Sequence, residues 1–300
     1  MATLRELKTR IGSVSSSEKI TGAMKMISSA KVHKSEAQLR QLVPFRNRIT
    51  EIVGHLLDAD AVFSSSLIEE RSEVKHVGIV VFGSDDGLCG AYNVNIYKYM
   101  LGVIGNLHEK YGKDVEITVY AVGSKMAKVA SKLNIPGTRV TTTAGVDSKM
   151  GGEKVSEFTD LMRKAFLSGE FDLVEVVYMK FHSISRQRPT SEQLFPVNPS
   201  ALLESAGTGS SNSANNKPYL FEPDPNAIFN QVLPMYVQST MQDITIENRA
   251  SEQAARIMAM QSANDNAKKL LESLQLEYNK LRQQSITTEL LDILGGQVEK

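Results

Sequence analysis

The last quarter of the chain carries apolar or small side chains at a regular spacing of three or four residues. Neither proline nor glycine occurs between Met235 and Leu294, so this stretch can form a continuous helix of about 90 Å at 1.5 Å per residue. Steps of three and four residues alternate in the contact seam of a left-handed coiled coil. The expected seam residues are Ile246, Ala250, Ala254, Ile257, Met260, Ala263, Ala267, Leu270, Leu274, Tyr278 and Leu281.

The N-terminal segment repeats this pattern and contains no proline before Pro44. Gly12 and Gly22 each weaken such a helix by roughly 1 kcal/mol relative to alanine. A serine run at 15–17 also interrupts its apolar seam. A segment with so low an intrinsic helix propensity needs a partner to form a stable helix. The alanines of the C-terminal seam allow another helix to approach closely. We therefore expect the two chain ends to pair, with an N-terminal seam of Leu4, Leu7, Ile11, Val14, Ala23, Ile27 and Ala30.

Between the two ends, short apolar runs alternate with segments of helical spacing. The run Val77–Phe82 is typical of a buried central strand, and the alternation predicts a mostly parallel sheet covered by helices. The segment Ser205–Lys217 is rich in serine, glycine and asparagine, which predicts a flexible loop without a core. The other predicted strands are Val115–Val122 and Leu173–Phe181, and the predicted helices are Asn93–Tyr111, Lys125–Leu133 and Glu153–Ser168.

The composition is that of a soluble folded chain, with 41% hydrophobic and 23% charged residues in 300. Tryptophan is absent, which favours a large share of long helix over globular core. The formal net charge is zero, but residues 1–48 hold ten basic and three acidic side chains. This basic end favours an acidic partner over general nucleic-acid binding.

The single cysteine, Cys89, excludes an internal disulfide framework and a cysteine-based zinc cluster, and it fits a reducing compartment. No run approaches the 18 or more apolar residues of a membrane-spanning helix. The N-terminus has neither the apolar core of a signal peptide nor the composition of a transit peptide. We expect a soluble protein that works in the compartment where it is made.

One loop lies where a phosphate loop would lie in an α/β protein. The segment Ser84–Ala91 follows a predicted strand and precedes a helix, but it matches neither common glycine pattern, and Asp85 and Asp86 would repel phosphate. A structural turn is favoured over a nucleotide site, and Gly123-Ser124-Lys125 is expected to start a helix. Cys89 is expected to be a buried small residue rather than a nucleophile, and the five histidines have no metal-ligand spacing.

Both chain ends and two segments between them resemble one family. Residues Ile11–Lys31 closely resemble the first helix of the F-type ATP synthase gamma subunit, and Ala250–Ala267 and Tyr278–Gly296 resemble its last helix. The segments Asp86–Gly90 and Phe221–Pro225 also match, in the family's order. Asp86 stands where the family usually has arginine, so no shared role is carried over to that side chain. Gln297 stands where the family signature continues with Gly-Ala.

The resemblance implies an α/β fold in which the N- and C-terminal helices form a long antiparallel coiled coil beside a central Rossmann-like α/β domain. The corresponding divisions are an N-terminal coiled-coil helix at 1–57, the α/β domain at 75–200, a flexible connection at 201–222 and a C-terminal coiled-coil helix at 226–296.

The function implied is that of a rotor shaft without a catalytic site or cofactor of its own. In this family the coiled coil penetrates a hexamer of alpha and beta subunits, and the α/β domain rests on the membrane ring of c subunits beside the epsilon subunit. Proton flow turns the ring and the shaft, which drives the beta sites through their binding states. The implied location is peripheral, at the cytoplasmic face of the bacterial inner membrane.

The resemblance and the basic first helix together suggest residues that contact the alpha and beta subunits. The motif Met24-Lys25-Met26 would give a charged yet adaptable contact with an acidic loop. Arg282 and Gln283 match family positions that hydrogen-bond to a beta-subunit loop; without the family they would be assigned as solvated helix positions. The expected partner-binding residues are Met24, Lys25, Arg282, Gln283, Ile286, Thr287 and Glu289.

Two other classes of protein share parts of this pattern. A nucleotide-dependent α/β enzyme with helical arms would need a phosphate loop, and nucleotide titration would detect one. A coiled-coil adaptor would share the helices but would have no reason to carry the terminal Ile286-Thr-Thr-Glu289 signature. The sequence leaves open the coupling ion, the size of the c-ring and the preferred direction of the enzyme.

Overall fold

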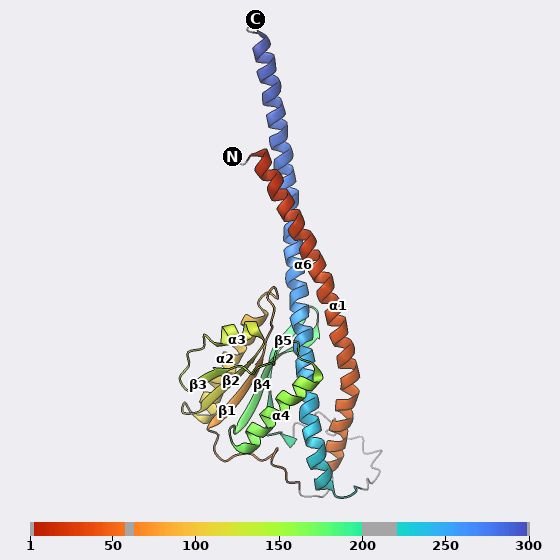
Figure 1. Ribbon diagram of the computed structural model, residues 1–300, viewed down its shortest axis with the longest axis vertical. Coiled ribbons are helices and arrows are strands. Elements are labelled where there is room, and N and C mark those ends of the chain that lie inside the picture. The colour runs from red at the N-terminus through yellow and green to blue at the C-terminus, as the bar shows by residue number, and fades with distance from the viewer. Residues whose placement is uncertain (1–2, 58–62, 200–220, 299–300) are drawn as a thin grey trace. The chain divides into compact units, whose positions relative to one another are not determined.

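The computed structural model describes residues 3–57, 63–199 and 221–298. Two long helices, α1 (Leu4–Leu57) and α6 (Pro225–Val298), enclose the rest of the chain in sequence (Figure 1). Three shorter helices, α2 (Tyr92–Tyr111), α3 (Ser124–Ala130) and α4 (Gly152–Ser168), alternate with strands. The connection expected at 201–222 lies almost wholly outside the described residues.

The strands form one five-stranded sheet in the order β3-β2-β1-β4-β5. Strand β1 (His76–Phe82) pairs in parallel with β2 (Glu116–Val122) and with β4 (Leu173–Ser183), and β2 pairs in parallel with β3 (Thr138–Thr141). Strand β5 (Arg186–Phe195) is antiparallel to β4. Strands β2 and β3 therefore lie on one side of β1, and β4 and β5 lie on the other. This is the arrangement of a Rossmann-like sheet.

Each face of the sheet has its own apolar core, because alternate strand residues point to opposite faces. On one face Val77, Ile79 and Val81 pack with α2 and α3. On the other face Val80 and Phe82 pack with α4 and with the parts of α1 and α6 that lie beside the sheet. Both faces of the sheet are thus covered, as the near-continuous apolar β1 sequence predicts.

The predicted helices and strands of the α/β domain are confirmed with shifts of at most three residues at their ends, and two strands were missed. Strand β3 has only four residues, none of them fully buried, so it lacks the apolar run of a central strand. Strand β5 contains Pro189 and mostly polar, partly exposed side chains. Both lie at sheet edges, where the hydrophobic signal is weakest and proline is tolerated.

The chain divides into two compact units, and both long helices contribute to each. The first unit, called here the shaft pair, is Met1–Ala30 with Arg256–Lys300, and the second, called the body, is Lys31–Ala255. In the body, α1 and α6 are joined by an ion pair of 2.8 Å between Arg46 and Asp243.

Within the shaft pair, polar contacts show that the two helices are antiparallel. Lys25 Nζ donates a hydrogen bond to Gln261 Oε1. Asn264 Nδ2 donates to the Glu18 carbonyl at 2.7 Å and to Thr21 Oγ1 at 3.3 Å. Residue numbers fall along α1 while they rise along α6, so the antiparallel pairing expected from the resemblance is confirmed.

The contact face of α1 differs from the predicted seam in its second half. Ala23 and Ala30 are exposed and Ile27 is 57% exposed, so these three seam predictions are wrong. The face that meets α6 keeps strict steps of three and four but becomes polar after Val14. Its members in the shaft pair are Leu4, Leu7, Ile11, Val14, Glu18, Thr21, Lys25 and Ser28, all buried or half-buried.

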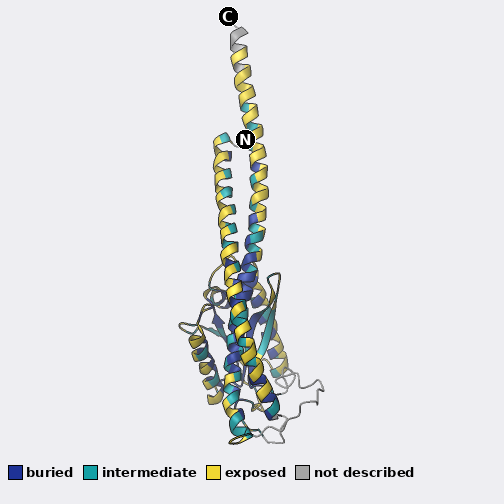
Figure 2. Ribbon diagram, turned by 90° about the vertical axis from the view of Figure 1, so that its right-hand side faces the viewer, coloured by how far each residue is buried: buried dark blue, intermediate teal, exposed yellow. Residues whose placement is uncertain are grey.

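The seam of α6 was predicted more accurately. Ala250, Ala254, Ile257 and Met260 are buried, whereas Leu270 is exposed because Leu271 occupies the contact face. Residues 286–291 of α6 lie past the start of α1 and are exposed (Figure 2). Large apolar side chains exposed near this end of α6 are Ile286, Leu290, Leu291, Ile293 and Leu294, and Leu276 is exposed earlier on the helix, on the side away from Leu274.

Candidate functional site

The carboxyl ends of β1 and β4 meet at the point where a Rossmann-like sheet ordinarily binds its ligand. In this chain α6 occupies that position. Asn248 Nδ2 donates to the Gly83 carbonyl just after β1 at 3.2 Å, and its Oδ1 accepts from the Met179 amide of β4 at 3.4 Å. The Tyr92 hydroxyl, at the start of α2, donates to Asn248 Oδ1 at 2.6 Å. The crevice is therefore filled by a side chain of the protein itself.

Ser251 adds a second polar contact one turn further along α6. Its hydroxyl donates to the Met179 carbonyl at 2.8 Å, and the side chain is fully buried. Asn248 is only 1% exposed, so water cannot replace either set of bonds. Asn248, Ser251, Tyr92, Gly83 and Met179 together form what we call the α6 junction, which joins the helix to both central strands and to α2.

The loop after β1 is a structural turn, as the sequence indicated. The Asp85 carboxylate accepts hydrogen bonds from the Ser124 amide at 2.9 Å and from the Ser148 amide and hydroxyl at 3.0 and 2.7 Å. Ser124 begins α3, so a carboxylate takes the place at this helix N-terminus that a phosphate would need. Gly123 has φ +99°, and a Cβ there would lie 2.9 Å from the Ser84 carbonyl oxygen, so the loop backbones approach closely. This arrangement argues against a nucleotide site.

Two further residues of this loop, Cys89 and Asp86, contact other side chains of the body. Cys89 is buried, as predicted, and lies 3.7 Å from Ser84 Oγ. Asp86 forms an ion pair of 2.8 Å with Lys149. Asp86 therefore pairs with a cation from the segment that leads into α4.

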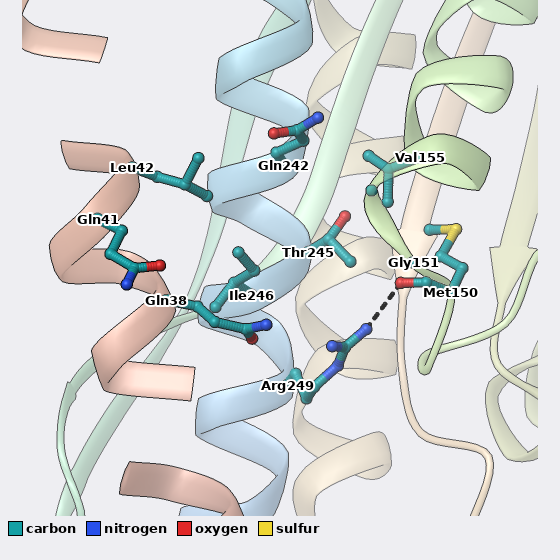
Figure 3. A pocket seen from close by; sticks show the side chains of 11 residues that line it. Gln38, Gln41, Leu42, Met150, Gly151, Val155, Gln242, Thr245, Ile246 and Arg249 are labelled. Carbon is teal, nitrogen blue, oxygen red and sulfur yellow. Dashed lines mark hydrogen bonds between the residues drawn. The ribbon is translucent and has the colours of Figure 1, made fainter. Parts of the chain in front are cut away.

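A pocket of about 270 Å³ lies in the body between α1, α6 and the start of α4 (Figure 3). Arg249 of α6 points across it and donates to the Ser148 carbonyl at 3.2 Å and to the Met150 carbonyl at 2.9 Å. Burial lowers the pKa of the Arg249 guanidinium. The rest of the lining is mixed, with Gln38, Gln41, Leu42, Gly151, Gly152, Val155, Gln242, Thr245 and Ile246. Arg249 thus fastens α6 to the segment before α4 on this face of the body.

The partner-binding residues expected from the sequence all lie in the shaft pair. Lys25 and Met24 are half-buried on α1, and the ammonium of Lys25 is used by Gln261. On α6 the expected residues are all exposed, and Thr287 donates only to the Gln283 carbonyl within the helix. The exposed members on α6 are Arg282, Gln283, Ile286, Thr287 and Glu289.

The residues of the α6 junction were missed from the sequence. Asn248 and Ser251 lie among small and charged residues on a helix, and their partners in β4 and after β1 are 69 or more residues away in sequence. The one available signal was that these polar residues flank Ala250, which was assigned to an apolar seam. A polar side chain beside a buried helix face needs a hydrogen-bond partner. That requirement could have marked Asn248 and Ser251 as residues that contact another part of the fold.

In the described ranges no three or more histidine, cysteine, aspartate or glutamate side chains are grouped to hold a metal ion. None of the helices, as far as their residues are described, has a stretch both long and apolar enough to span a bilayer.

The fold and the site define a class of protein in which a Rossmann-like body holds a long helix at the usual ligand position of its sheet. Comparison with known proteins identifies the family. A family model described as ATP synthase matches residues 3–298. The ATP synthase gamma chains of Bacteroides thetaiotaomicron and Phocaeicola vulgatus are 35% and 38% identical, over 100% and 99% of this chain and 100% and 99% of theirs. The chain therefore belongs to the ATP synthase gamma chain family, whose members are non-catalytic subunits.

Solved structures agree on the fold. A chain of the Euglena gracilis mitochondrial ATP synthase, in an assembly of OSCP, F1 and c-ring, has a TM-score of 0.66 at 20% identity. The match covers 98% of this chain and 93% of that one. A chain of the rotor of the same enzyme gives a TM-score of 0.61 at 18% identity, over 94% and 98% of the two chains. The long terminal helices with a central sheet are thus shared with these distant chains.

Proposed function

We propose that this chain is the central rotor shaft of an F-type ATP synthase, which couples proton-driven rotation of a membrane c-ring to the catalytic sites of the beta subunits. The observation that carries the proposal is the match of nearly the whole chain to the gamma chain family. The similar solved chains come from assemblies described as F1 with c-ring and as a rotor, which supports these partners. The family resemblance adds the epsilon subunit.

A shaft has to transmit torque, so its helices must be fixed to the part of the protein that is turned. The α6 junction supplies such an attachment, because buried hydrogen bonds join α6 to β1, β4 and α2. Arg249 and the Arg46–Asp243 ion pair attach α6 to two further segments of the body. Several bonds from different directions resist both rotation and sliding of the helix.

The exposed apolar end of α6 fits a helix that works inside another assembly. Leu276 is 72% exposed, and further large apolar side chains follow it toward the C-terminus. Exposed apolar surface of this extent is typical of a protein interface. We assign the alpha and beta subunits as its partners, with Met24, Lys25, Arg282, Gln283, Ile286, Thr287 and Glu289 among the contacts. The location proposed is the cytoplasmic face of a bacterial inner membrane, which is supported by the similarity to the gamma chains of two bacteria, Bacteroides thetaiotaomicron and Phocaeicola vulgatus.

Affinity purification from the native membrane tests this function. A tagged chain is extracted under mild conditions, and the proteins that accompany it are quantified by mass spectrometry against an untagged strain. The alpha and beta subunits are expected in equal amounts and in excess over the tagged chain, together with epsilon and the c subunit. Recovery of the chain alone, or with unrelated soluble proteins, would contradict the proposal.

A further inference from the structure

A cluster of five charged side chains lies in the body where α6 meets α1 and the β4–β5 edge of the sheet. Arg46 of α1 is paired with Asp243 of α6, which is almost fully buried. Lys180 of β4 lies 3.7 Å from Glu192 of β5. Glu247 follows Asp243 by one helical turn on α6, and the other four charges act on its carboxyl group. Four elements therefore contribute charge to one partly buried region.

The three carboxylates of this cluster have unequal partners. Asp243 has a guanidinium at 2.8 Å. Glu192 accepts a hydrogen bond from the Tyr178 hydroxyl at 2.7 Å and lies beside a lysine. Glu247 Oε2 is buried and has no hydrogen-bond partner among the residues that the structure describes. Two cations face three carboxylates, so full ionisation leaves one excess negative charge, which is costly in a buried region.

We propose that Glu247 is a proton-binding switch: in its neutral form it lets α6 pack against β5 and α1, and in its ionised form it loosens that attachment. Burial and, to a smaller extent, the charges of Glu192 and Asp243 raise the pKa of Glu247 to about 7, against the opposing effect of Lys180 and Arg46. The side chain thus titrates close to neutral pH. This inference goes beyond the rotor function, because it concerns the attachment of α6 within the body and holds for any partner of the shaft.

The position of Glu247 links the switch to the α6 junction, since Asn248 is the next residue. A neutral carboxyl group can donate a hydrogen bond and adds no repulsion toward Glu192 and Asp243. The folded chain keeps this proton to a higher pH than the unfolded chain, in which the ordinary pKa of the side chain is 4.5. The contribution of Glu247 to stability is therefore full below that value and is lost as the pH rises to about 7.

The test compares thermal unfolding of the full chain and of its Glu247→Gln variant at pH 5 and at pH 8. Glutamine resembles the neutral carboxyl group, so the variant should match the wild type at pH 5 and melt at a higher temperature at pH 8. The control is Glu157→Gln, an exposed position on α4, for which the difference from wild type should be the same at both pH values. A Glu247→Gln effect that does not change with pH would overturn the proposal.

A second measurement follows the proton itself. Infrared difference spectra of the full chain should show the carbonyl band of a protonated carboxyl group. This band should disappear as the pH rises, with a midpoint at a pH of about 7, and it should be missing in Glu247→Gln. Removing the charge of Glu192 with Glu192→Gln should move this midpoint to lower pH. A Glu247 band that titrates near 4.5, or a midpoint unchanged by Glu192→Gln, would show that the cluster does not act as a switch.

Discussion

Replacing Asn248 with alanine removes the side chain that joins α6 to β1 and α2. Two well-formed hydrogen bonds are lost, from the Tyr92 hydroxyl at 2.6 Å and to the Gly83 carbonyl at 3.2 Å. Each neutral bond contributes about 1 kcal/mol, and a buried carbonyl left without a donor costs a further ~1–3 kcal/mol. The Tyr92 hydroxyl keeps its bond to the backbone carbonyl of residue 248 at 2.9 Å, so no penalty is added for it. We expect Asn248→Ala to lower the free energy of unfolding by about 3–5 kcal/mol.

Urea denaturation of the full chain measures this loss, and the assembled enzyme reports its consequence. ATP-driven proton pumping by membranes should fall more than ATP hydrolysis, because a weakened junction transmits less torque. Gln231→Ala, an exposed position on α6 in the body, is the matched control and should leave both quantities unchanged. If Asn248→Ala changed the unfolding free energy by less than about 0.5 kcal/mol, as an ordinary surface substitution does, the α6 junction would not hold the helix.

Three other variants, together with the control Gln261→Ala, test separate parts of the account. Lys25→Glu should cost on the order of 1 kcal/mol at a partly exposed interface and reduce coupling in a salt-dependent way. Gln261→Ala removes the hydrogen bond to Lys25 but keeps the lysine charge, so it separates the loss of this bond within the shaft pair from the effect of the charge reversal. Wild-type ATP hydrolysis and proton pumping in Lys25→Glu would remove Lys25 from the interface. Changing Arg282 and Gln283 together to alanine should slow steady-state ATP hydrolysis at unchanged subunit content, and full activity would show that both are solvated helix positions. Asp85→Ala should lower the melting temperature of the chain, because each hydrogen bond to a carboxylate contributes roughly 1.5–3 kcal/mol, and an unchanged melting temperature would exclude a structural role.

The elements with strong periodicity could be predicted from the sequence, and those at edges could not. The apolar seam of α6 around Ala254 and Ile257 is buried as expected, since small and apolar side chains at steps of three and four leave little choice of face. On α1 the same steps continue through Thr21 and Lys25, but these side chains are polar. Apolar patterning then favoured Ile27, on the exposed side of the helix.

The site was harder to predict than the fold because its contacts join distant parts of the sequence. The phosphate-loop alternative was disfavoured from Asp85 and Asp86, whose negative charge is visible in the sequence. That Asp85 holds Ser124 and Ser148 depends on loops that only the folded sheet brings together. The same holds for Asn248, because no local pattern shows that a helix near the C-terminus will fill the crevice beside β1.

Rotation of the assembled complex tests the central claim most directly. Lys132→Cys places a thiol at an exposed position after α3, while the native Cys89 is only 3% exposed, so a probe can be attached at one site. With the alpha and beta subunits immobilised, the probe should turn in one direction when ATP is added and stop when ATP is removed. A complex that retains this chain and hydrolyses ATP while the probe stays fixed would contradict its role as the rotor shaft.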